Sequence, residues 1–473
     1  MINTRHKSVP DIVFGIGLLL FALLHLRGIT YPPNGYHQWR ESDTAAIILN
    51  YYQEDWSFLE PRINQRGDGS GITGMEFPVY QYLSALGYEV IGPYHAVPRL
   101  LTLLGGLVGA LFFYLTIRSQ FDRFTAIGAG LGLLFSPLYL FYSSKIMPDI
   151  WMLAFLAAAV WMFFRFLATG SIVAMIGFPL LLTLSACIKP LGLCVFLPAL
   201  LTAPKHSRRR MAVVWLGLCA LVAIGLTWLW FTYARTVSAA NGGGGFFLGD
   251  YIPEFWKTIP VVSFFKHIFI QWPWELWLGY AVVPIFCFGL YSAFRNRQGN
   301  FYLWWIVACL IVFIPAGAHT SSHDYYSLPI VLPMALLTGL GFGALYQKRE
   351  WVRGVAIALI LVAPAAATAR IAHRTATVPE FEPLRAVADT YIPRTSLVAV
   401  EEHTSAIKLY QLNRHGWPIR GDMTYDKLRT PIDKGAEFVI LEQPLRCYDT
   451  AIARLLDTSP VSTSPMFVYH VRK

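Results

Sequence analysis

The sequence predicts a polytopic α-helical membrane protein with a small α/β domain at its C-terminal end. Only 14% of the 473 residues are charged and 55% are hydrophobic, whereas soluble domains carry about 25% charged residues. Several apolar stretches approach or exceed the ~18 residues that indicate a spanning helix. The net charge of +10 arises mostly in short loops between apolar runs, where basic residues set membrane orientation, so nucleic-acid binding is not indicated.

About eleven membrane spans can be placed along residues 1–370. The first follows Arg5 and Lys7 and could be mistaken for a signal peptide, but no small-residue cleavage site follows it, so we expect an anchor. The expected spans are 11–27, 97–117, 124–142, 150–168, 172–187, 190–204, 211–232, 276–294, 301–318, 327–346 and 353–370.

The loop charges predict the orientation of these spans. Basic residues occupy the N-terminal tail and alternate loops, which by the positive-inside rule are cytoplasmic. The loops 28–96 and 233–275 and the segment 375–473 are then extracytoplasmic. We expect the first of these loops to carry a surface helix at 78–92, where apolar residues form one stripe, and the second to carry another near 255–272.

The segment 375–473 differs in composition from the apolar part and predicts a separate α/β domain. It contains short β-branched and aromatic runs typical of strands, and two amphipathic stretches typical of helices. The expected strands are 396–400, 437–442 and 466–471, and the expected helices are 405–414 and 447–457.

A set of polar residues near span ends is not explained by the positive-inside rule. Charges at membrane depth are unfavourable and tend to mark a functional cavity. All members of the set fall on the expected extracytoplasmic side, so we expect them to converge on one pocket. They are Arg40, Glu41, Asp43, Glu76, Lys145, Asp149, Lys189, His319, His323, Asp324, Tyr325 and Tyr326.

Three of these charges stand next to a proline, at Glu76-Phe-Pro78, Pro148-Asp149 and Lys189-Pro190. Proline is favoured in the first turn of a helix, so each charge is expected at a helix start. The helix dipole favours the two carboxylates there, but Lys189 needs an anion beside it, either a carboxylate or a phosphate.

Several members also have a purely structural interpretation. Asp149 could be an ordinary helix cap, Asp43 could cap a helix that starts there, and Lys189 could extend its ammonium to the interface. Glu41 could be a solvated charge at a helix start, and Arg40 could be a structural partner of a nearby carboxylate. Tyr325 and Tyr326 could belong to the aromatic belt at the membrane surface. It is the combination of these residues on one side of the membrane that favours a functional site.

Such a combination suits the transfer of a sugar from a phosphate-linked isoprenoid lipid. The lipid phosphate would lie at headgroup depth, where Lys and Arg side chains would hold it and stabilise it as the leaving group. A carboxylate would take the proton from an acceptor hydroxyl that attacks the anomeric carbon, and direct displacement inverts that centre.

From about residue 10 to about residue 345 the sequence resembles the GT-C glycosyltransferases of the protein O-mannosyltransferase and lipid A aminoarabinose transferase type. Motifs of that family match Asp43 in "RESDTAAIILNYY", Glu76-Phe77-Pro78, Asp149, Lys189-Pro190 and His323-x-Tyr325-Tyr326-x-x-Pro329. The aminoarabinose enzyme has a lysine after its glutamate where this chain has Phe77, so its substrate is not carried over.

The resemblance implies a GT-C fold in a bacterial inner membrane and a polyprenyl-phosphate sugar donor. The acceptor would be a hydroxyl of a glycolipid, polysaccharide or protein. It assigns Asp43 as general base or acceptor-orienting residue. It assigns Glu76 and Asp149 as catalytic carboxylates that position the sugar or acceptor, or that support Asp43. It assigns the donor phosphate to Lys189, His323, Tyr325 and Tyr326, and we add Arg40.

The resemblance implies no nucleotide cofactor, and it leaves open a divalent ion beside the carboxylates. Two other functions also stay open at this point. One is a flippase for polyprenyl-linked lipids that performs no chemistry, although transporters usually place ionisable groups near the bilayer midplane. The other is a neighbouring enzyme type such as an O-antigen ligase.

Overall fold

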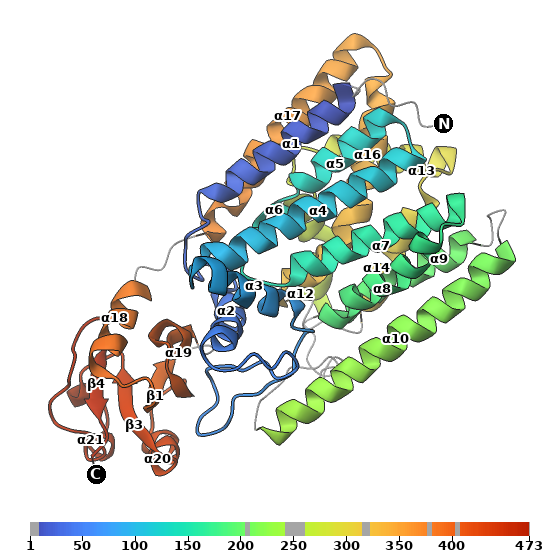
Figure 1. Ribbon diagram of the computed structural model, residues 1–473. Coiled ribbons are helices and arrows are strands. Elements are labelled where there is room, and N and C mark those ends of the chain that lie inside the picture. Colours follow the sequence, from blue (N-terminus) through green and yellow to red (C-terminus); the bar gives the residue numbers. More distant parts are fainter. Residues whose placement is uncertain are drawn as a thin grey trace. The chain divides into compact units, whose positions relative to one another are not determined.

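A computed structural model describes residues 9–203, 209–241, 261–314, 322–375, 381–402 and 407–472. The chain divides into two compact units (Figure 1). The helical unit comprises Met1–Ile29, Arg99–Phe231 and Phe246–His373, and the mixed unit comprises Thr30–Pro98, Thr232–Gly245 and Arg374–Lys473. The predicted boundary between residues 1–370 and 375–473 stays a prediction.

The helical unit is a bundle of apolar helices, some of which extend past its limits. They are α1 (Val9–Leu26), α4 (Ala96–Gln120), α5 (Arg123–Leu134), α6 (Pro137–Tyr142), α7 (Asp149–Thr169), α8 (Ile172–Ile188), η1 (Pro190–Val195), α9 (Phe196–Thr202), α10 (Arg209–Ala240), α12 (Val261–Phe265), η3 (Lys266–Gln271), η4 (Pro273–Trp277), α13 (Val283–Asn296), α14 (Asn300–Phe313), η5 (Asp324–Ser327), α16 (Leu328–Tyr346), α17 (Glu350–Ile371) and η6 (Ala372–Arg374).

Every predicted span overlaps one of these helices or a consecutive pair. Within the described residues, five helices are long and apolar enough to cross a membrane: Ala96–Gln120, Asp149–Thr169, Met211–Ala240, Asp324–Tyr346 and Glu350–Arg374. Several others are apolar but shorter. The total of about eleven crossings stays a prediction.

Two predicted spans differ from the structure for a local reason. The span expected at 124–142 is broken between α5 and α6, where Pro137 opens the second helix after Ser136. The span expected at 276–294 begins later, at Val283, because the π-helical turn Pro273–Trp277 is followed by a bend and turns over residues 278–282.

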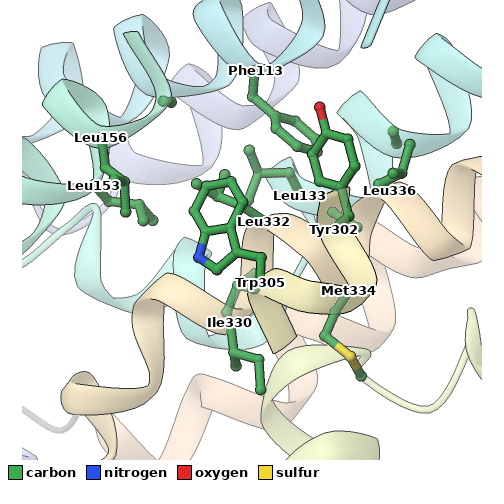
Figure 2. Close-up of a cluster of buried hydrophobic side chains, with 14 of the residues drawn as sticks. Phe113, Leu133, Leu153, Leu156, Tyr302, Trp305, Ile330, Leu332, Met334 and Leu336 are labelled. Atoms are coloured by element: carbon green, nitrogen blue, oxygen red, sulfur yellow. The ribbon is translucent and has the colours of Figure 1, made fainter. Parts of the chain in front are cut away.

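Helix α16 lies at the centre of the bundle and packs against α5, α13, α14 and α17. Close approach of α13 and α16 requires glycine, since a Cβ at Gly289 would lie 1.8 Å from the Leu337 backbone oxygen. Figure 2 shows the aromatic side of this core, where Tyr302 and Trp305 of α14 lie among leucines of α16.

The mixed unit combines the first loop with the C-terminal α/β domain. Its sheet has the order β2-β1-β3-β4, with β1 parallel to β2 and β3 and with β4 antiparallel to β3. Its elements are α2 (Gln38–Gln53), α3 (Val79–Ile91), α18 (Phe381–Tyr391), β1 (Leu397–Glu402), α19 (Ile407–Leu412), β2 (His415–Arg420), α20 (Tyr425–Asp433), β3 (Ala436–Leu441), η7 (Leu445–Cys447), α21 (Thr450–Ala453) and β4 (Phe467–His470).

The predicted secondary structure of this unit is mostly confirmed. The three expected strands correspond to β1, β3 and β4, and the surface helix expected at 78–92 is α3. The edge strand β2 and the helices α18 and α20 were not predicted. Of the surface segment expected at 255–272, residues 255–260 lie outside the described ranges.

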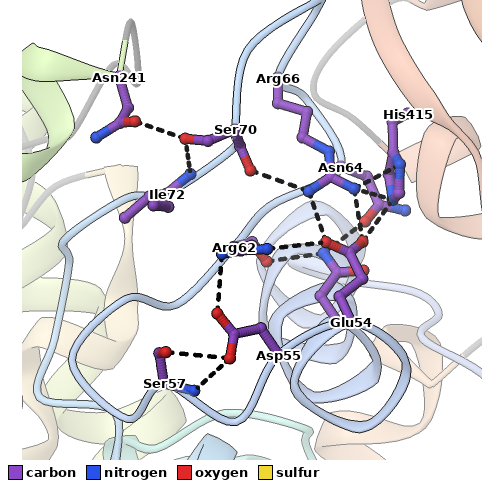
Figure 3. Close-up of polar contacts among 11 residues, drawn as sticks. Glu54, Asp55, Ser57, Arg62, Asn64, Arg66, Ser70, Ile72, Asn241 and His415 are labelled. Carbon is purple, nitrogen blue, oxygen red and sulfur yellow. Dashed lines mark hydrogen bonds and ion pairs between the residues drawn. The ribbon is translucent and has the colours of Figure 1, made fainter.

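The first loop is fastened to the edge strand β2 by backbone and charged contacts. The Gly67 N–H donates to the Gly416 oxygen at 2.9 Å, and Arg66 contacts both Glu54 and His415 (Figure 3). Burial alone would raise the pKa of Glu54, but hydrogen bonds and charge from His415 and Arg66 lower it to about 2. These contacts connect the C-terminal end of α2 to the sheet.

Candidate functional site

Lys189 lies at a break between two helices of the helical unit. Helix α8 ends at Ile188, Lys189 is extended with φ −146° and ψ 128°, and Pro190 starts the 3₁₀ helix η1. Its ammonium forms an ion pair with Asp149, the first residue of α7 after the N-cap Pro148. Both helix-start positions were predicted, and the anion expected beside Lys189 is a carboxylate of the protein itself.

Two tyrosine rings lie against the same ammonium. The Lys189 Nζ atom lies 3.9 Å from the Tyr325 ring centroid and 4.7 Å from that of Tyr326. The His323 ring stacks on Tyr325 with centroids 5.4 Å apart and an interplanar angle of 6°. Cation–π contacts of a desolvated ammonium are each worth about 2 kcal/mol. We call Asp149, Lys189, His323, Tyr325 and Tyr326 the Lys189 cluster.

This cluster is built to hold a charge inside an apolar bundle. The Asp149 side chain is fully buried and that of Lys189 is 10% exposed. The second carboxylate oxygen of Asp149, Oδ2, has no hydrogen-bond partner among the described residues. A buried ion pair of this kind is weak evidence for stability, which makes the cluster a candidate functional site.

A second charged cluster lies in the mixed unit, between α2 and α3. The Arg40 guanidinium forms a buried ion pair with the Glu76 carboxylate, and the Gln81 amide donates to Glu76 at 3.4 Å. Glu41, which is fully buried, accepts the Asn34 backbone N–H at 3.2 Å. With Asp43, the residues Arg40, Glu41, Glu76 and Gln81 are called here the Arg40 cluster.

Asp43 has a carboxylate with a raised pKa. Burial raises the pKa of Asp43 to about 6. The positive charges of Arg40 and Arg420 lower this pKa, and the negative charge of Glu76 raises it further. Helix α2 begins at Gln38 after the N-cap His37, whose φ of 62° is left-handed. Asp43 therefore lies in the second turn, and the alternative that it caps a helix is wrong.

The spacing to Pro78 had predicted that Glu76 lies at a helix start, and this prediction is wrong. Pro78 is the N-cap of α3, so Glu76 stands outside the helix and gains little from its dipole. Its negative charge is compensated by Arg40 instead. Gln81 and Arg420 were not predicted, because a single amide outside the apolar stripe of α3 and an arginine on an edge strand carry no distinctive pattern.

The eight predicted site residues thus fall into two clusters, one in each unit. Arg40, Asp43 and Glu76 belong to the mixed unit, and the other five form the Lys189 cluster. Their convergence on a single pocket stays a prediction. His319 lies outside the described residues, and the described ranges contain no group of three His, Cys, Asp or Glu side chains that could hold a metal.

Comparison with known proteins agrees with the fold. Residues 76–231 match the family described as dolichyl-phosphate-mannose-protein mannosyltransferase. Among solved structures, ArnT from Cupriavidus metallidurans bound to undecaprenyl phosphate is similar with a TM-score of 0.66 and 14% identity over 97% of each chain. Its apo form gives 0.64 and 15% identity over the same shares.

An archaeal enzyme shares the architecture over a smaller part of its length. The Archaeoglobus fulgidus oligosaccharyltransferase, in a complex with Zn and sulfate, has a TM-score of 0.61 and 13% identity over 90% of this chain and 67% of its own. No curated protein matches the sequence. The chain has the GT-C fold, and the fold and the family match together indicate a membrane glycosyltransferase.

Proposed function

We propose that the protein transfers a sugar from a polyprenyl-phosphate donor to an acceptor hydroxyl, with inversion at the anomeric carbon. The observation that carries the proposal is the Lys189 cluster, an ammonium held by one carboxylate and two aromatic faces inside an apolar bundle. Two comparisons support the donor class, since one similar structure is bound to undecaprenyl phosphate and the matching family is named for dolichyl-phosphate mannose.

In this proposal Lys189 binds the donor phosphate and stabilises it as it leaves. Negative charge grows on the phosphate as its bond to the sugar breaks, and a preorganised ammonium lowers the energy of that state. The pair with Asp149 orients the Lys189 side chain before the donor arrives. Tyr325 and Tyr326 can donate hydroxyl hydrogen bonds to phosphate oxygens, and His323 supports the Tyr325 ring.

Asp43 acts as the general base. The acceptor oxygen attacks the anomeric carbon, its proton passes to the Asp43 carboxylate, and the electron pair of the breaking C–O bond leaves with the phosphate. A pKa near 6 makes Asp43 a stronger base at neutral pH than an ordinary aspartate. Glu76 raises that pKa through its negative charge, and Arg40 holds Glu76 in place through their ion pair. Glu76 and Arg40 therefore act as positioning residues for Asp43.

The positive-inside rule supports an extracytoplasmic site. A bacterial inner membrane agrees with the undecaprenyl phosphate bound in one similar structure. The donor is then activated inside the cell, and the transferase itself needs no nucleotide. Glycolipids, polysaccharides and proteins all remain acceptor candidates. A divalent ion beside the carboxylates remains open as well.

The test is turnover by the purified full-length protein. Reconstituted in lipid vesicles with a synthetic undecaprenyl-phosphate sugar and a cell-envelope extract, it should release undecaprenyl phosphate and form a glycosylated product. Movement of the lipid between leaflets without release of the sugar would identify a flippase and refute the proposal. Transfer only from undecaprenyl-diphosphate glycans would indicate an O-antigen ligase type instead.

The role of Lys189 has its own variant test. Lys189→Ala should weaken binding of undecaprenyl phosphate by roughly tenfold to a hundredfold, because hydrogen bonds to charged groups contribute about 1.5–3 kcal/mol. Lys348→Ala, an exposed lysine beyond α16, serves as the control and should bind like wild type. Equal affinities for all three proteins would remove Lys189 from the donor site.

A further inference from the structure

We infer that Tyr142 and Asp324 are positioning residues for the donor, acting through Tyr325 on the ammonium of Lys189. The inference rests on the proposed function, because it concerns how the Lys189 cluster is held ready for a phosphate. Asp324 belongs to the polar set expected at the pocket, but no role was assigned to it there. Tyr142 lies in an apolar run, where it resembles an ordinary core residue.

The two residues make a direct hydrogen bond at the edge of the cluster. Tyr142 is the last residue of α6 and is fully buried, and its hydroxyl donates to the carboxylate of Asp324. Asp324 is only 1% exposed and starts η5, so it immediately precedes Tyr325 in the chain. The bond therefore fixes the backbone from which the Tyr325 ring projects.

The Tyr142 ring also contacts the Tyr325 ring itself. Their centroids lie 5.9 Å apart at an interplanar angle of 86°, an edge-to-face arrangement. Tyr325 is thus held by an edge-to-face contact with Tyr142 and by the His323 ring stacked on it at 6°. Because the attraction between Lys189 and the ring depends on the direction of the ring face, these contacts determine how well the ammonium is held.

A second anchor fixes the other end of the same turn. The Ser327 hydroxyl donates to the Asp324 backbone oxygen at 2.6 Å, and the Trp277 indole N–H donates to the Ser327 hydroxyl at 3.0 Å. All of η5 is therefore held between α6 on one side and η4 on the other. Of the two anchors, Tyr142 contacts the Tyr325 ring directly, so the effect on donor binding is assigned to Tyr142 and Asp324.

A functional site of this kind needs its contact residues fixed by supporting contacts, since small displacements weaken binding and reaction. Loss of the Tyr142 hydroxyl should let the turn before Tyr325 shift and should loosen the ring against Lys189. The expected signature is a raised KM for the donor with a smaller effect on kcat, because the chemistry at the acceptor does not involve Tyr142.

The experiment compares Tyr142→Phe with Tyr139→Phe. Tyr139 lies one turn earlier on α6, is also buried, and donates its hydroxyl to the Gly106 backbone oxygen at 2.5 Å. Both variants lose one buried hydroxyl, so both should lose similar thermal stability. Only Tyr142→Phe should weaken binding of undecaprenyl phosphate, by about fivefold to twentyfold. Equal donor affinity in the two variants would overturn the inference.

Substitution of Asp324 provides a rescue control. Asp324→Asn keeps an oxygen that accepts the Tyr142 hydroxyl and should retain most donor affinity, whereas Asp324→Ala should behave like Tyr142→Phe. The double variant Tyr142→Phe/Asp324→Ala should be no worse than either single one, since both remove the same bond. Additive losses would contradict a shared role.

Wild type and Lys189→Ala are measured in the same series to separate two failures. If wild type does not bind undecaprenyl phosphate, or if Lys189→Ala binds it equally well, the proposed function fails. If those two proteins behave as proposed while Tyr142→Phe matches Tyr139→Phe, the positioning role alone is refuted.

Discussion

Replacing Asp43 with asparagine is expected to abolish most activity and, above pH 6, to stabilise the fold. The pKa of Asp43 rises from 3.8 to about 6, chiefly because burial disfavours the charged carboxylate. Above pH 6 the folded protein must hold this carboxylate ionised, whereas the unfolded chain ionises it freely. The native state therefore loses stability as pH rises through about 6.

The shift sets the size of the effect. About two pKa units correspond to about 3 kcal/mol at 1.36 kcal/mol per unit, an upper bound because the Asp43 side chain keeps partial exposure. Asp43→Asn removes the ionisable group, so the gain in thermal stability should be present at pH 8 and absent at pH 4. Activity should fall by roughly 10²–10⁴-fold, the usual contribution of a general base.

The wild-type pH profile provides the matching assay. If Asp43 is the base, kcat/KM should fall on the acidic side with an apparent pKa of about 6, so that at pH 5 only about a tenth of the plateau rate remains. Thermal unfolding in detergent at pH 4 and pH 8 measures the stability. An asparagine variant with near wild-type activity, or with no stability difference between the two pH values, would refute the reasoning.

Three further predictions concern the fold. Gly289→Ala should lower the unfolding temperature strongly, with a penalty of about 3 kcal/mol or more. The reason is that the alanine Cβ would lie 1.8 Å from a backbone oxygen of α16. Gly217→Ala, with open space around it, is the neutral control. Arg414→Ala should destabilise the C-terminal domain by about 3 kcal/mol, since its buried guanidinium donates to carbonyls at the end of α18, and hydrogen exchange there should accelerate. Glu54, whose pKa is lowered to about 2, should stabilise the mixed unit above pH 4.5 and lose that effect as pH falls towards 2. Glu54→Gln should therefore lower the free energy of unfolding by about 1–2 kcal/mol at pH 7 but little at pH 2, and acid unfolding measures the difference.

The parts of the fold that follow from local pattern were predictable from the sequence. Long apolar runs identified the helices of the bundle, and Pro148 and Pro190 located the starts of α7 and η1. The unfavourable position of Lys189 at a helix start predicted an anion beside it, and Asp149 supplies one. These inferences needed only hydrophobicity, proline geometry and the helix dipole.

Features that depend on distant partners were not predictable in this way. The strand β2 contains Gly416 and Pro418, which interrupt a strand pattern, and it is supported by the first loop through Gly67. The start of α2 at Gln38 depends on a left-handed His37 that no composition rule indicates. The role inferred for Tyr142 likewise arises from tertiary contacts with residues far along the chain.

The most direct test of the central claim is to locate the donor phosphate on the protein. An undecaprenyl phosphate analogue with a diazirine in its first isoprene unit can be photo-crosslinked to the reconstituted protein and mapped by mass spectrometry. Binding at the Lys189 cluster predicts adducts near residues 323–327 and 145–149, suppressed in Lys189→Ala. Adducts confined to the basic loops near Arg295 and Lys348, and unchanged in Lys189→Ala, would contradict it.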